Sequence, residues 1–60
     1  MTRYRVTVTH KFVYDMEENS PKEAGEEGDR RAFGDLTHNS PDIQVDELDD
    51  EGLVVQTWYQ

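Results

Sequence analysis

The fold is decided first by residues 3–14, which read RYRVTVTHKFVY. Apolar or aromatic side chains alternate with polar ones along this stretch, and this period of two is typical of a β-strand. The alternation gives one nearly apolar face, while the other face carries three basic side chains and two threonines. We therefore predict one strand over residues 3–14, in a sheet with one buried and one solvated face.

A helix is predicted over residues 21–33. Ser20 is a good N-cap, Pro21 suits the first helical position, and Glu23 stands where a capping box needs a carboxylate. Arg30 and Arg31 lie in the last turn, where their positive charges interact favourably with the helix dipole, and Gly34 is placed to end the helix. The small residues of this helix, spaced four apart, predict a smooth stripe that packs closely on a sheet: Ala24, Gly28 and Ala32. A helix that orders only on a partner is the alternative.

Two further strands are predicted, over residues 42–48 and 53–59. Residues 49–52 read DDEG and predict a tight turn in which Gly52 takes a positive φ. The connection over residues 35–41, with its NSP turn signal, reads as a loop from which Leu36 folds back over the core. The predicted fold class is α+β: one domain over residues 1–60, in the order β-α-β-β, with a helix on one face of a three-stranded sheet. The last strand is apolar on both sides, which favours a central place in the sheet, and the first strand would then lie at an edge.

Length and composition exclude several classes of protein. The chain has 60 residues, no cysteine and 33% hydrophobic residues, so we expect no disulfide framework, no thiolate zinc site and no enclosed cleft for a large cofactor. No apolar run approaches the roughly 20 residues that span a bilayer. The N-terminal residues lack the apolar core of a secretory signal. We expect a soluble, cytoplasmic protein.

Residues that could perform catalysis are few. His10 falls on the predicted apolar face, where a satisfied histidine is expected rather than a base. His38 falls in the loop beside Asp35 and Asp42, where a solvated side chain is expected rather than a weak divalent-ion ligand. Residues 46–52 are rich in carboxylates but lack calcium-loop spacing. We therefore predict a protein that is not an enzyme and that has no metal and no cofactor.

Charge is distributed unevenly along the chain. The formal net charge is −8, yet residues 1–14 hold three basic and no acidic side chains, so all 14 acids lie in residues 15–60. A molecule with this negative charge repels nucleic acid and anionic lipid, and its charge favours binding to a basic protein partner. Acidity that serves only solubility or adaptation to high salt is the equally weighted alternative.

Two candidate partner-binding surfaces follow from this distribution. The first is acidic, and helical spacing of its carboxylates would let it mimic the phosphates of DNA; it comprises Glu23, Glu26, Glu27 and Asp29 on the helix, with Asp46, Glu47, Asp49, Asp50 and Glu51 near the last turn. The second is the outer sheet face, where Arg3 and Arg5, with Lys11 and Val13, adjoin Trp58. Tryptophan beside basic residues is a common hot-spot composition, although core packing is the expected role of Trp58.

A strand YRVTVT followed by NSPKEA at a helix start resembles small proteins of phages and mobile elements. These are the DpnD/PcfM-type proteins and the short phage inhibitors of bacterial RNA polymerase, and several anti-CRISPR proteins are similar in size and acidity. The chain departs from them at Gly25 and Gly28, where they usually carry larger helix formers. The resemblance implies a phage origin and assigns no functional residue.

The function expected from these observations is that of a small acidic, phage-encoded interaction protein. It would inhibit or modulate a basic nucleic-acid-handling host protein, such as an RNA polymerase, a nuclease or a CRISPR effector, by charge-complementary occlusion. The alternative is a self-associating module, such as a homodimer, that uses the edge of the first strand or the Trp58 face. Direct nucleic-acid binding and membrane binding are not expected.

Overall fold

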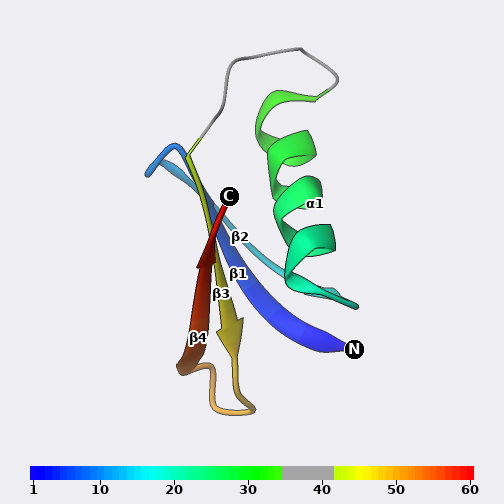
Figure 1. The fold of residues 1–60 in the computed structure, drawn as a ribbon, viewed down its shortest axis with the longest axis vertical. Coiled ribbons are helices and arrows are strands. Elements are labelled where there is room, and N and C mark those ends of the chain that lie inside the picture. The colour runs from blue at the N-terminus through cyan, green and yellow to red at the C-terminus, as the bar shows by residue number, and fades with distance from the viewer. Residues whose placement is uncertain (35–41) are drawn as a thin grey trace.

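A computed structural model describes residues 1–34 and 42–60 and shows a small α+β domain with one helix against an antiparallel sheet (Figure 1). Its elements, in chain order, are β1 (Thr2–Val8), β2 (Phe12–Glu18), α1 (Pro21–Phe33), β3 (Ile43–Leu48) and β4 (Val54–Tyr59). The sheet therefore has four strands, and the prediction of three strands in the order β-α-β-β is wrong. The predictions for residues 35–41, including Leu36 and His38, lie outside the described residues.

The missed strand comes from residues 3–14, which form a β-hairpin and not one strand. Val8 lies opposite Phe12 in the register, and the N–H of Lys11 donates to the carbonyl of Val8 at 3.1 Å. The two residues between Val8 and Lys11, Thr9 and His10, have positive φ angles of 53° and 59°. His10 is therefore an exposed turn residue and does not lie on the apolar face of a strand.

The strand order in the sheet is β2-β1-β3-β4. β1 lies between β2 and β3, while the C-terminal strand β4 lies at an edge, so both expectations for strand position are wrong. The sheet contains two hairpins, β1–β2 and β3–β4, and antiparallel pairing of β1 with β3 joins them. These two strands hold most of the buried apolar side chains of the sheet, among them Val6 and Val45, so interior positions suit them. The self-association alternative that used a free edge of the first strand has no such edge in this sheet.

The helix forms with the bounds and caps that the sequence predicts. The Ser20 hydroxyl accepts a hydrogen bond from the N–H of Glu23 at 3.2 Å, and Gly34 ends the helix with a φ of 66°. The predicted small-residue stripe packs on the sheet: Ala24 and Gly28 are buried, and Ala32 packs against the core. A Cβ atom at Gly28 would lie 2.4 Å from Cγ1 of Val6, so glycine is required there for close contact between helix and sheet.

The core lies between α1 and the sheet face that β1, β2 and β3 present to it. Its buried residues are Tyr4, Val6, Val8, Met16, Ala24, Ile43 and Val45. Two edge-to-face aromatic pairs extend it, Phe12 with Phe33 and Tyr4 with Trp58, at ring-centroid distances of 6.2 and 6.4 Å.

The β3–β4 turn forms at the predicted place. Gly52 has a φ of 84° and donates its N–H to the carbonyl of Asp49 at 3.0 Å. The Asp49 carboxylate accepts hydrogen bonds from the N–H groups of Glu51 and Leu53, at 2.9 and 2.8 Å. Asp49 thus closes the turn, a local role that short polar side chains perform well.

Candidate protein-interaction surface

One row of polar side chains crosses the sheet face opposite the helix. The register sets Arg5 between Asp15 of β2 and Asp46 of β3, and sets Asp46 opposite Thr57 of β4. The Nε and Nη2 atoms of Arg5 donate to the two carboxylate oxygens of Asp15, at 2.9 and 3.4 Å. This hydrogen-bonded pair lowers the pKa of Asp15 and raises the pKa of Arg5. The predicted basic face therefore has one of its charges neutralised within the sheet.

Asp46 occupies a different position from the other predicted acidic residues, because it is buried, with 7% of its surface exposed. Its Oδ1 accepts from the hydroxyl of Thr57 at 2.7 Å, and both carboxylate oxygens accept from Nε2 of Gln44 at 3.2 Å. The Thr57 contact joins β3 to the edge strand β4, while the Gln44 contact lies within β3. The structure gives Asp46 a place in the sheet and not on an exposed surface.

The acidic residues of the helix are offset by neighbouring bases. Glu27 forms ion pairs with Arg30 and Arg31, at 3.2 and 3.1 Å. Glu23 and Glu26 are exposed, while Glu27 and Asp29 are half-buried. The helix also carries Lys22, so its four acids stand against three bases and its charge is nearly balanced.

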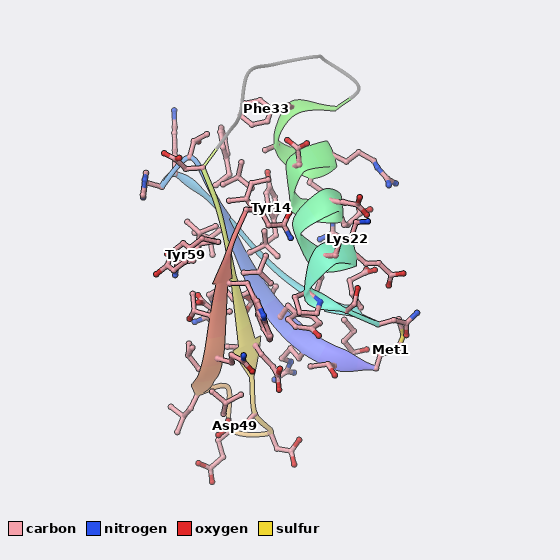
Figure 2. All side chains as sticks on the ribbon, in the orientation of Figure 1. Met1, Tyr14, Lys22, Phe33, Asp49 and Tyr59 are labelled. Atoms are coloured by element: carbon pink, nitrogen blue, oxygen red, sulfur yellow. The ribbon has the colours of Figure 1, made fainter. Side chains whose placement is uncertain are left out.

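A stronger concentration of carboxylates lies at one end of the sheet. Antiparallel pairing brings together the start of β1, the end of β2, the end of β3 and the start of β4. We call the carboxylates at this place the acidic end: Glu17, Glu18, Glu47, Asp49, Asp50 and Glu51. In Figure 1 the β3–β4 turn forms the lower tip of the molecule, and Figure 2 shows Asp49 there.

Arg3 is the basic side chain at the acidic end. It is exposed and lies opposite Glu17 in the register, and both residues line a surface hollow together with Asp50. The hollow shows that β2 and the β3–β4 turn contribute to one continuous surface. The candidate residues drawn from the sequence do not include Glu17 and Glu18, which fall between the predicted strand over residues 3–14 and the predicted helix over residues 21–33. The structure places both at the end of β2, and a signal for the first hairpin could have found them.

Trp58 lies on the other face of the sheet from Arg3 and Arg5. It is opposite Val45 in the register, is half-buried, and packs against Tyr4. Core packing accounts for this position. The structure therefore does not bring Trp58 together with the two arginines.

Residues 1–34 and 42–60 contain no group of three histidine or acidic side chains arranged to hold a metal ion. Within the same residues no helix has the length and apolarity needed to cross a bilayer. The chain matches no protein-family model, no curated protein and no solved structure.

Proposed function

We propose that this protein is an acidic interaction module whose acidic end binds a basic surface on a partner protein. The observation that carries the proposal is the gathering of six carboxylates at one end of the sheet, beside a single arginine. Complementary charge raises the rate of encounter and selects the orientation of docking. The opposite end of the sheet carries Lys11 together with Asp42, and Arg30 and Arg31 lie in the last helical turn beside Glu27, so the described residues there hold no comparable excess of carboxylates.

The partner class that fits this surface is a nucleic-acid-handling protein, such as an RNA polymerase, a nuclease or a CRISPR effector. Such proteins line their binding channels with lysine and arginine, because they must neutralise phosphates. An acidic tip on a narrow sheet, 34 Å along the longest axis of the molecule, can enter such a channel and occlude it. The proposed activity is thus inhibition or modulation without bond chemistry, and a phage origin agrees with it.

The test compares two variants with the same net charge. The first removes three charges of the acidic end (Glu17→Gln, Asp50→Asn, Glu51→Gln), and the second removes three charges elsewhere (Glu23→Gln, Glu26→Gln, Asp42→Asn). Each variant moves the formal net charge from −8 to −5. Binding to purified RNA polymerase, a nuclease and a CRISPR effector is measured by biolayer interferometry at low and at high salt.

We expect the unaltered chain to bind at least one of the three proteins, and binding to weaken as salt rises. The first variant should lose most of this binding and the second should retain it. Equal loss in the two variants would mean that only total charge matters, and this would refute a role for the acidic end. Binding to none of the three would refute the proposed partner class.

A further inference from the structure

The edge strand β4 differs from the rest of the chain in charge and exposure. No charged side chain occurs from Gly52 to Gln60, although one third of all residues are charged. Val54, Val55 and Tyr59 of this strand are 51%, 56% and 78% exposed. Helix α1 packs on β1, β2 and β3, and Figure 2 shows Tyr59 on the side of the sheet away from the helix. β4 therefore presents apolar side chains to water.

The backbone of β4 is also unpaired along its outer edge. The N–H of Gln60 donates to the carbonyl of Ile43 at 2.9 Å, so Gln60 directs its backbone toward β3. Backbone groups alternate in direction along an antiparallel strand. Thr57 and Tyr59, which lie between Gln60 and the register shift of the β3–β4 pairing, consequently direct their N–H and carbonyl groups outward, where no strand of the described residues pairs with them.

The two edges of the sheet are protected to different degrees. Proteins commonly block a free edge with charged side chains or proline. The β2 edge carries three carboxylates, Asp15, Glu17 and Glu18, which would meet like charges if two copies paired there. β4 has neither charge nor proline, so it is the edge on which a second acidic chain can pair without placing carboxylates opposite each other.

We propose that β4 pairs antiparallel with β4 of a second copy, which joins two four-stranded sheets into one sheet of eight strands. The contact is symmetric, because the same strand supplies both sides and each copy meets the other through identical residues. Centred on Thr57, the pairing sets the two Thr57 residues opposite each other and brings Tyr59 of one copy near Val55 of the other, a β-branched and aromatic pair.

Charge supports a second copy as the occupant of this edge. Antiparallel pairing puts the acidic turns of the two copies at opposite ends of the shared strands. A strand of six residues spans about 20 Å, which is about twice the Debye length at physiological salt. The two acidic ends therefore stay apart and remain exposed, so dimerisation is compatible with the proposed function and does not depend on it.

The test measures the mass in solution by sedimentation equilibrium over a concentration series. We expect twice the chain mass of 7.0 kDa, and a dimer that tightens as salt rises because salt screens the repulsion between the copies. Binding through the acidic end should change with salt in the opposite direction. A chain that stays at 7.0 kDa at the highest concentration and high salt would overturn the proposal.

Two matched substitutions locate the interface. Val55 and Val13 are both 56% exposed on the same face of the sheet, but they lie on opposite edge strands. Val55→Lys should raise the dimer dissociation constant about tenfold or more, while Val13→Lys should leave it unchanged. Tyr59→Pro removes an outward N–H and should also abolish the dimer, with circular dichroism as the check that each chain is folded. Dimers that survive both Val55→Lys and Tyr59→Pro would refute pairing through β4.

Discussion

Gly28→Ala is expected to destabilise the protein, against the usual effect of this change in a helix. Alanine favours a helix over glycine by about 1 kcal/mol. At Gly28, however, the new Cβ would lie 2.4 Å from Cγ1 and 3.1 Å from Cβ of Val6, which is fully buried and cannot move away. Overpacking of this kind costs about 1–3 kcal/mol. At so short a distance the upper part of that range applies, so the free energy of unfolding should fall by about 1–2 kcal/mol.

Gly25→Ala in the same helix is the matched control. Its Cβ would lie 2.5 Å from the amide end of Gln60, an exposed and flexible side chain that can rotate away. Rotation loses only the hydrogen bond from Gln60 Nε2 to the carbonyl of Pro21, which is 3.3 Å long. The helix propensity gain then dominates, and Gly25→Ala should be neutral or stabilising by up to about 1 kcal/mol.

Urea denaturation followed by circular dichroism, at one fixed chain concentration, measures both variants. A difference of 1 kcal/mol corresponds to about 4–8 °C in melting temperature for a domain of this size. In the double variant Val6→Ala, Gly28→Ala, the methyl group of the new alanine in the helix enters the space that the Val6 side chain leaves. The loss of unfolding free energy in the double variant should therefore be about 1 kcal/mol smaller than the sum of the two single losses. If Gly28→Ala raises the urea midpoint, or if Gly25→Ala lowers it equally, close helix–sheet contact does not explain these glycines.

Three other changes test individual contacts. Ser20→Ala removes the helix N-cap and should lower the free energy of unfolding by about 1 kcal/mol, as measured by urea denaturation; an unchanged midpoint would show that the cap contributes nothing. Asp46→Ala leaves the Thr57 hydroxyl without its buried acceptor and should lower the free energy of unfolding by about 1–3 kcal/mol in the same assay. The loss should be smaller when Thr57→Val is already present, and equal losses in the two backgrounds would contradict the contact. Asp15→Asn should destabilise the protein at neutral pH but not in strong acid. Because Arg5 lowers the pKa of Asp15 from its ordinary value of 3.8, the pair contributes fully above that value and is lost as the pH falls through the folded-state pKa, so a difference between the chains that persists in acid would refute the assignment.

Local signals in the sequence were enough for the helix and the last hairpin. Capping by Ser20, proline at the first helical position and Gly34 after the last turn each act within a few residues. Gly52 likewise takes the positive φ of the predicted turn. The predicted strands over residues 42–48 and 53–59 agree with β3 and β4 to within one residue at each end. Such features depend on near neighbours in the chain, so the sequence alone predicts them.

The first hairpin could not be predicted from the same kind of signal. Its turn residues Thr9 and His10 have positive φ, which a β-branched residue rarely adopts, and no glycine, asparagine or proline marks the place. The register also sets Val8 opposite Phe12, so inward-facing residues keep even numbers on both sides of the turn. The alternation therefore passes through the turn unbroken and imitates one long strand.

Residue type and short-range spacing are enough to predict the helix, the apolar face of the sheet and the excess of carboxylates. Which carboxylates share a surface depends on how the strands pair. The tertiary structure buried Asp46 beside Thr57 of β4, paired Glu27 with two arginines, and brought Glu17 and Asp50 to one surface hollow. The physical reason is that strand order and register depend on pairing between distant segments, whose contacts form between residues far apart in the chain.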